Sequence, residues 1–272
     1  MDARPLSQVL YLYGFVPRGT SSPPESLRGV AAAGVDLLDL GEVSAAVSSV
    51  PADAFAPETL EERVHDLAWV GEQGALHERV VTWFVDHGGV LPARLLTLYT
   101  GADALRASLA GRAGEVAERL SRLRGLREWD LKVSYDGAVL ADHLGELSSE
   151  IASLDEELAA SSPGRRYLLE RKRQQLLKTE VSRAARGLAG EVLEGLLALA
   201  SEDRRLPLPG GQGELPVVLN AALLLASDRE AEARSRVERE QERLRPLGLE
   251  VHFTGPWAPY RFLGEEEVSN RG

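Results

Sequence analysis

Apolar side chains recur at steps of three and four residues through the middle of the chain, and the positions between them are mostly polar or charged. The first run comprises Leu140, Leu144, Leu147, Ile151, Leu154 and Leu158. The second run comprises Leu169, Leu176 or Leu177, Val181, Ala184, Leu188, Val192 and Leu196. Such spacing places about one apolar side chain per turn on a narrow stripe of a helix. The pattern therefore predicts two long charged helices within residues 136–205.

The residues between the two runs, Ser161-Ser162-Pro163-Gly164, predict a tight turn. Proline is tolerated at the first position of a helix, and Ser162 can cap the free backbone amides there. The two helices are therefore expected to fold back on each other as a hairpin. One interpretation is that the stripes close on each other within the chain. The other is that the seam also takes a helix from a partner.

Shorter patterns before the hairpin predict strands and two helices. The expected strands are 9–16, 35–40, 43–48, 90–96 and 128–135, and the expected helices are 57–86 and 102–123. The first helix carries Leu60, Val64, Leu67, Val70, Leu76, Val80, Trp83 and Phe84 near helical spacing. Gly71 and Gly74 are expected to loosen it, because glycine costs about 1 kcal/mol inside a helix. A mostly antiparallel sheet with helices on one face is the simplest packing that buries the apolar sides of these elements. Residues 1–136 are therefore predicted to form an α+β domain. Its layout is expected to be ferredoxin-like, a variant of the split βαβ arrangement.

The remainder of the chain predicts a second domain across residues 137–272. After the hairpin (137–205) come a turn-rich connector at 206–213, a buried strand at 216–226, a charged helix at 228–244 and a strand at 249–254. The last stretch, 255–262, is an aromatic tail that carries two prolines. The strand, helix and strand are expected to form a small sheet attached to the hairpin.

Composition and charge narrow the classes of function. The net charge is −11, from 42 acidic and 31 basic side chains, which repels phosphate backbones and argues against a nucleic-acid partner. The chain has no cysteine, which excludes disulfides and thiolate metal sites. The longest apolar run, 215–226, is too short to span a bilayer as a helix. We therefore expect a cytoplasmic protein without membrane insertion.

The sequence carries no pattern that predicts catalysis, a cofactor or a metal. None of the five histidines falls in a zinc-protease spacing, and structural or solvated roles are expected for them. The glycines at 210–213 precede a predicted strand, whereas a phosphate-binding loop opens into a helix. A Gly-x-Ser-x-Gly elbow is absent. The protein is therefore not expected to be an enzyme.

Two groups of residues are candidates for binding a partner. Trp257, Tyr260 and Phe262 lie close together in the tail and are either binding anchors or a cover for the sheet that they follow. Arg165 and Arg166 lie near the start of the second hairpin helix, where positive charge opposes the helix dipole. They either pair with acids across the turn or bind an acidic partner.

Seven motifs, in order along the chain, resemble the gas vesicle protein F/L family. They are Tyr11-Leu12-Tyr13-Gly14, His77-Glu78-Arg79-Val80, Val90-Leu91-Pro92, the stretch 128–133, the turn 162–168, Leu219-Asn220-Ala221-Ala222, and the stretch 249–262. The resemblance covers essentially the whole chain. The sequence departs from the family pattern at Ala258 and Arg261, which replace a proline and a serine, and at Leu95-Leu96.

The resemblance implies an accessory gas vesicle protein with a ferredoxin-like N-terminal domain and a C-terminal domain with a long helical element. Members are thought to bind the small hydrophobic shell protein and other accessory proteins during assembly, in a chaperone-like role. A soluble, acidic protein that delays aggregation of an apolar subunit is physically sensible. The alternative is a regulatory protein whose ferredoxin-like domain binds a small ligand.

Overall fold

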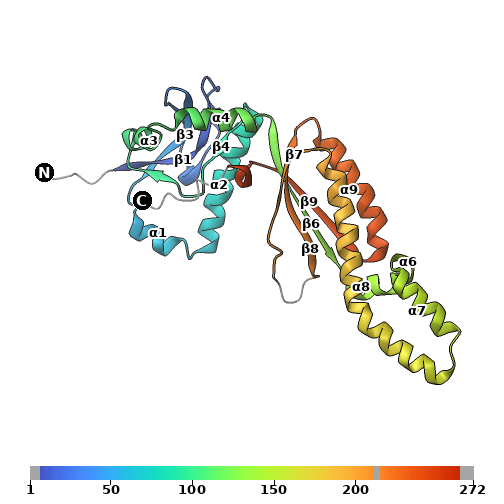
Figure 1. Cartoon of the computed structure of the whole chain (residues 1–272). Helices are drawn as coiled ribbons and strands as arrows, with labels where there is room; N and C mark the ends of the chain where they lie inside the picture. The colour runs from blue at the N-terminus through green and yellow to red at the C-terminus, as the bar shows by residue number, and fades with distance from the viewer. Residues whose placement is uncertain (1–6, 211–214, 264–272) are drawn as a thin grey trace. The chain divides into compact units, whose positions relative to one another are not determined.

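The computed structural model describes residues 7–210 and 215–263, and the chain divides into two compact units. The first unit contains residues up to 127 together with those from 257 onward, and the second unit contains residues 128–256. The chain therefore passes between the units twice (Figure 1). This division differs from the expected boundary at 136/137, because the strand at 128–135 lies in the second unit and the aromatic tail lies in the first.

The sheet of the first unit is built around β1 (Gln8–Pro17). β1 pairs antiparallel with β3 (Val43–Pro51) along its whole length, and β2 (Asp36–Asp39) lies on the far side of β3. On the other side, β1 pairs with two short strands, β4 (Leu91–Pro92) and β5 (Leu98–Tyr99). A single strand had been predicted across 90–96; only its start pairs with β1.

The two faces of this sheet are covered by different helices. Tyr11 and Tyr13 pack in one cluster with Phe84 of α2 (Leu67–Asp86). Leu12 points to the opposite face and packs in a second cluster with Leu105 of α3 (Ala102–Ser108). The expectation of helices on one face was wrong. A strand buried on both faces, as β1 is over Tyr11–Gly14, shows no alternation that would reveal it.

Gly14 lets another strand pass close to β1. The register of β1 against β3 shifts between Leu12 and Gly14, which marks a bulge. A Cβ atom at position 14 would lie 2.5 Å from the backbone oxygen of Leu91. Glycine is therefore required in the motif Tyr11-Leu12-Tyr13-Gly14 by the close approach of β4.

Both predicted helices of the first unit are broken in two. α1 (Pro57–Arg63) ends before α2, and the Asp66 side chain caps α2 by accepting hydrogen bonds from the backbone amides of Ala68 (3.0 Å) and Trp69 (3.2 Å). Gly71 and Gly74 lie inside α2, so the break is not at the glycines. The second predicted helix is split into α3 and α4 (Ala113–Leu123) around Gly111, whose φ of 77° is left-handed.

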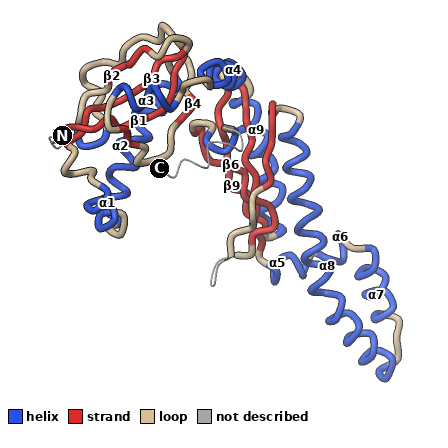
Figure 2. The backbone as a smooth tube through the Cα atoms, turned by 60° about the vertical axis from the view of Figure 1, so that its left-hand side comes forward, coloured by secondary structure: helices blue, strands red, loops and turns tan. Residues whose placement is uncertain are grey.

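The second unit is a four-stranded sheet with helices packed on it. The strands are β6 (Leu126–Tyr135), β7 (Ala200–Arg205), β8 (Val217–Ala226) and β9 (Leu249–Trp257), in the order β7-β8-β6-β9. α8 (Pro163–Leu197) and α9 (Glu230–Leu244) lie along one face of it (Figures 1 and 2). Trp129, Leu131 and Val133 of β6 form a core cluster with Leu193 and Leu196 of α8.

The helical hairpin is present, and its first arm is broken into three helices. These are α5 (Gly137–Asp142), α6 (Leu144–Leu147) and α7 (Ser149–Ala159). Ser148 is extended at the last break, and its hydroxyl accepts a hydrogen bond from the amide of Ile151 (3.4 Å). The second arm ends at Leu197, and Ala200–Arg205 is the charged strand β7 rather than the end of the helix.

The stripes of the hairpin close on each other within the chain. Ile151 and Leu154 of α7 are buried, as are Val181 and Leu188 of α8. Leu147 lies off the seam and is exposed, because the break at Ser148 changes the phase of the helix. The outer part of the hairpin projects beyond the sheet of its own unit (Figure 1). The intramolecular hairpin is therefore the structure that forms, and a partner helix on the seam stays a prediction.

Candidate interaction surfaces

The end of the aromatic tail is buried in the first unit. Phe262 and Ala258 are inaccessible to solvent or nearly so, and Leu263 is buried as well. Arg119 and Arg122 of α4 donate hydrogen bonds to the backbone oxygens of Leu263 (2.9 Å) and Phe262 (2.8 Å). The tail therefore completes the core of the N-terminal unit. It does not cover the sheet that it follows.

Tyr260 joins the tail to α2 and β1 through a chain of side-chain hydrogen bonds. The amide of Leu96 donates to the hydroxyl oxygen of Tyr11 (3.1 Å), and the same hydroxyl is hydrogen-bonded to Nδ1 of His77 (2.8 Å). Tyr11 is the donor to Nδ1 when the imidazole is neutral and carries its proton on Nε2. Nε2 of His77 then carries the proton and donates to the hydroxyl oxygen of Tyr260 (3.2 Å), which donates to Glu78 Oε2 (3.1 Å). The backbone of Ala93 is a further hydrogen-bond partner of His77.

Burial sets the protonation of the same groups. It lowers the pKa of His77 to about 4, from an ordinary value of 6.5. It also raises the pKa of the Tyr11 and Tyr13 hydroxyls above the ordinary value of 10. His77 and the two tyrosine hydroxyls are thus neutral at physiological pH. This agrees with the structural role expected for the histidine.

Of the three aromatic candidates in the tail, Trp257 has the side chain that is most exposed to solvent. It is 43% exposed, whereas Tyr260 is half-buried and Phe262 is fully buried. Tyr260 and Phe262 are therefore occupied within the unit. Trp257 can contact another molecule without rearrangement of the tail.

The two candidate arginines lie in solvent at the start of α8. Nη2 of Arg165 is 3.8 Å from Oε2 of Glu157 across the turn, and both side chains are mostly exposed. Arg166 makes no ion pair within the part of the chain that the structure describes. Further along the hairpin, Nε of Arg173 donates to Asp155 Oδ1 at 2.6 Å, which ties the helices together more closely. An exposed pair at 3.8 Å adds little stability, so the cations are available.

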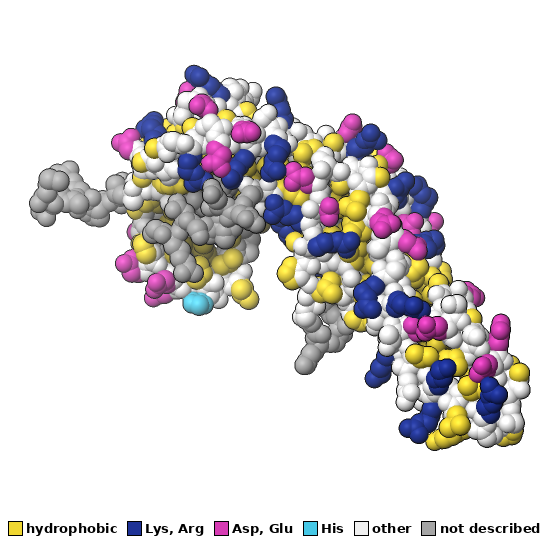
Figure 3. Space-filling view, viewed as in Figure 1, with side chains coloured by type: hydrophobic (Ala, Val, Ile, Leu, Met, Phe, Trp, Pro, Cys, Tyr) yellow, Lys and Arg dark blue, Asp and Glu magenta, His cyan; other side chains and the backbone are white. Residues whose placement is uncertain are grey.

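Beside these arginines lie two exposed apolar side chains that the sequence patterns did not single out. Tyr167 is 63% and Leu168 66% exposed. We call them the hairpin knob. Their position just after a turn, outside the stripe that begins at Leu169, is the signal that could have identified them. Figure 3 shows basic, acidic and apolar side chains close together over α7 and α8.

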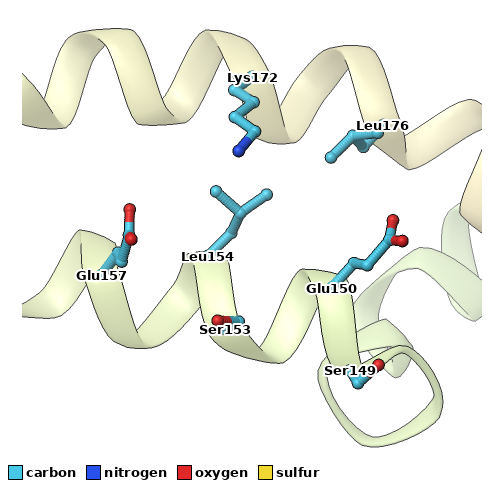
Figure 4. Close-up of a pocket in the computed structure, with 7 residues that line it drawn as sticks. All are labelled: Ser149, Glu150, Ser153, Leu154, Glu157, Lys172 and Leu176. Carbon is cyan, nitrogen blue, oxygen red and sulfur yellow. The ribbon is translucent and has the colours of Figure 1, made fainter.

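A groove of about 530 Å³ lies between α7 and α8, and we call it the hairpin groove. It is lined by Ser149, Glu150, Ser153, Leu154, Glu157, Lys172 and Leu176. Leu154 and Glu150 point from α7 toward α8, and Lys172 and Leu176 point back toward α7 (Figure 4). The groove therefore has two leucines at its floor, with carboxylates and an ammonium around them.

At the deep end of the hairpin, a carboxylate is buried. Glu180 is 4% exposed, accepts a hydrogen bond from the hydroxyl of Ser148 at 2.5 Å and pairs with Arg183. The hydrogen bond from Ser148 holds the pKa of Glu180 below its ordinary value. The bond fixes the break between α6 and α7 against α8, so it has a structural role.

A second exposed apolar surface lies where α1 meets α2. Leu67 is 84% and Val64 43% exposed, and we call the two the corner patch. Helical spacing had assigned both to the buried stripe. They are exposed because the chain turns at 64–66 between the two helices. The exposed acids Glu61, Glu62 and Asp66 surround the patch in sequence.

The described residues hold no group of three or more His, Cys, Asp and Glu side chains that could bind a metal ion. Among residues 7–210 and 215–263, no helix has the length and apolar character needed to cross a membrane.

Comparison with known proteins gives the same family throughout. A family described as "Gas vesicle synthesis protein GvpL/GvpF" matches residues 9–264. Gas vesicle protein L of Streptomyces sp. (strain CB03234) is 29% identical over 95% of this chain and 94% of its own length. Gas vesicle protein L1 of Halobacterium salinarum is 28% identical over 73% of this chain and 76% of its own length.

Solved structures share the fold. The crystal structure of GvpF from Anabaena sp. PCC7120 covers 96% of this chain and 100% of its own, with a TM-score of 0.67 and 18% identity. The structure of GvpF from Microcystis aeruginosa covers 94% of this chain and 99% of its own, with a TM-score of 0.64 and 18% identity. Both units are therefore present in these two structures.

Proposed function

The chain belongs to the gas vesicle GvpL/GvpF family, and on this premise we propose that it is an accessory protein that binds the apolar shell protein and other accessory proteins while vesicles assemble. The match from residue 9 to 264 carries this proposal, because it includes both units and the tail that joins them. The site of action is the cytoplasm, at the forming vesicle. The proposed function does not include a catalytic role.

The corner patch is the surface that we assign to the shell protein. Leu67 is the most exposed large apolar side chain of the described residues, and with Val64 it offers apolar surface at one corner of the fold. The acids beside it and the net charge of −11 oppose self-aggregation through the same surface. Arg63 lies 5.4 Å from the ring of Trp69, which holds the base of the patch in place. An apolar docking surface on an acidic protein suits a subunit that would otherwise aggregate.

Trp257, Arg165 and Arg166 stay candidates for contacts with other accessory proteins, because their side chains are open to solvent. Tyr260 and Phe262 support such contacts indirectly, since they hold the tail in the core of the first unit.

The test is co-expression with the shell protein, followed by affinity purification of the soluble fraction. We expect a soluble complex with the parent chain. Leu67→Asp is expected to reduce the amount of co-purified shell protein at least about tenfold, because it places a charge at the centre of the contact. Leu208→Asp, at a site that is 55% exposed in the second unit, is the matched control and should change nothing.

Two outcomes would contradict this assignment. If the shell protein aggregates regardless of the parent chain and nothing co-purifies, direct binding is excluded. If both aspartate variants retain it equally, the corner patch is not the docking surface. Thermal unfolding of each variant, expected to be unchanged, separates either outcome from loss of the fold.

We further infer that the ferredoxin-like layout belongs to the second unit rather than to residues 1–136. Its elements follow the order β6, α5 to α8, β7, β8, α9 and β9, and the first strand lies between the third and the fourth. This combination supports a split βαβ layout. In the first unit, β2 and β3 follow β1 with no α-helix between them, which agrees less well.

A further inference from the structure

The hairpin knob is an apolar pair surrounded by positive charge. The first 16 residues of α8, from 163 to 178, contain six basic side chains and one acidic side chain. Tyr167 and Leu168 are more than 60% exposed among them. Such a surface favours a partner that offers an apolar hollow with carboxylates beside it.

The hairpin groove is a hollow of this kind. Leu154 and Leu176 form its apolar floor, and the carboxylates of Glu150 and Glu157 stand beside them with one ammonium, that of Lys172, so that acidic groups outnumber basic ones (Figure 4). Glu150 makes no ion pair within the described residues, and Glu157 has only the 3.8 Å contact with Arg165. The charge and the polarity of the groove therefore complement those of the knob.

The knob does not fill the groove of its own chain. Tyr167 and Leu168 lie on the first turns of α8, and their exposed fractions of 63% and 66% show that residues 7–210 and 215–263 leave most of both side chains uncovered. Lys172 and Leu176 of the same helix line the groove further along. A knob and a groove on one rigid hairpin can be joined only through a second molecule.

We propose that the occupant of the hairpin groove is the hairpin knob of a second copy of this chain. Two hairpins pack side by side with opposite directions, so that each knob enters the groove of the other copy. Arg165 and Arg166 of one copy then face Glu150 and Glu157 of the other. The arrangement is two-fold symmetric and closes at a dimer.

The contact is small and partly made of exposed charges, so the dimer should be weak and dependent on salt. Interfaces below about 1,200 Å² are typical of transient complexes. Salt screens the attraction between exposed charges, and the Debye length falls to about 8 Å at 0.15 M salt. The attraction between the two copies should therefore weaken as salt is added. A nucleic acid is disfavoured as the occupant, because the carboxylates of the groove repel phosphate.

Charge reversal tests the pairing directly. Sedimentation equilibrium of the full chain at low salt should show a concentration-dependent mass that rises from 29.5 kDa toward twice that value. Leu168→Asp is expected to weaken association about tenfold. The acid-reversed variant (Glu150→Arg with Glu157→Arg) and the base-reversed variant (Arg165→Glu with Arg166→Glu) should each be monomeric. Mixed together, they should form a heterodimer, because each reversed surface then meets its complement.

Cross-linking fixes the geometry, because the natural chain has no cysteine. A Ser153→Cys variant mixed with a Gly164→Cys variant should give a disulfide-linked heterodimer, since the groove of one copy meets the turn of the other. Ser153→Cys mixed with Ser121→Cys, on exposed α4, is the control and should not. Gly164 has open space around its Cα, so the substitution does not strain the turn.

A parent chain that stays monomeric at every concentration would overturn the proposal. So would a dimer whose strength is unchanged in Leu168→Asp, or a mixture of the two reversed variants that stays monomeric. If the parent chain is monomeric and Leu168→Asp instead loses another gas vesicle protein, the knob serves that protein, and the proposal is again overturned. These results are independent of whether the corner patch binds the shell protein.

Discussion

Replacing Phe262 by alanine is expected to lower the free energy of unfolding of the first unit by about 4 kcal/mol. The side chain is completely buried, and its removal leaves a cavity in a core that cannot collapse around it. The backbone there is also held by Arg119 and Arg122. Trp257→Ala, only five residues earlier, is the matched control. It should cost less than about 1 kcal/mol, because Trp257 is 43% exposed.

Urea unfolding followed by circular dichroism measures both variants against the parent chain. The two units give separate transitions if they unfold independently, and only the transition of the first unit should move. The same experiment on a Trp257→Ala with Tyr260→Ala double variant tests the role of the tail. It is expected to weaken folding more than partner binding. A double variant that is as stable as the parent chain but loses its partner would make the tail a docking site.

The burial of the tail shows what the sequence could and could not predict. The aromatic residues between prolines indicate either a cover for the preceding sheet or a binding surface, whereas Phe262 is buried in the other unit, against α4. The identity of the covered surface could not be predicted, because it depends on contacts with α4 and α2, more than 130 residues away along the chain. Periodicity reports which face of an element is buried and says nothing about what buries it.

Element boundaries were less predictable than element types for a related reason. Apolar residues continue in nearly helical phase through Val64 and Leu67 and through Leu144 and Leu147, and yet the helices break there. Each break is fixed by a polar side chain, Asp66 or Ser148, that caps the next helix. An aspartate or serine in such a position is compatible with both a solvated helix face and a cap. The exposed side chains of the corner patch follow directly from one of these breaks.

The candidate cations could be predicted, and pairing with acids across the turn was one of the two interpretations, which the contact of Arg165 with Glu157 matches. The sequence predicts that Arg165 and Arg166 lie near the start of a helix. The contact of Arg165 with Glu157 at 3.8 Å, and the closer pair of Arg173 with Asp155, depend on how far apart α7 and α8 lie. That separation also creates the hairpin groove, which has no signature in the sequence. Interaction surfaces of this chain therefore arise from tertiary geometry added to exposed residues.

The His77 network has the same origin, since Tyr11, His77 and Tyr260 are far apart in the sequence and meet only in the fold. Its geometry fits a neutral imidazole: Nε2 donates its proton to Tyr260, whose hydroxyl donates to Glu78, and Nδ1 is left to accept from Tyr11. Protonation would place a second donor at Nδ1, opposite the hydroxyl of Tyr11. It would also place a positive charge in the core, since the His77 side chain is only 3% exposed.

The first unit should therefore lose stability as the pH falls. The pKa of His77 is about 4 in the folded chain and near 6.5 when unfolded, so the unfolded state binds a proton first. The contribution of the neutral histidine is fully present above pH 6.5 and is lost as the pH falls toward 4. A shift of this size corresponds to about 3 kcal/mol. Denaturant unfolding of the parent chain at intervals from pH 7.5 to 4 measures it.

A His77→Gln variant isolates this contribution from that of the carboxylates. Glutamine can accept from Tyr11 and donate to Tyr260, and it does not titrate. The difference in unfolding free energy between the parent chain and this variant should change by about 3 kcal/mol across that range, in the direction that disfavours the parent chain at low pH. If the His77→Gln difference is flat with pH, the imidazole is not held neutral by the fold, and the hydrogen-bond chain from Leu96 to Glu78 is assigned incorrectly.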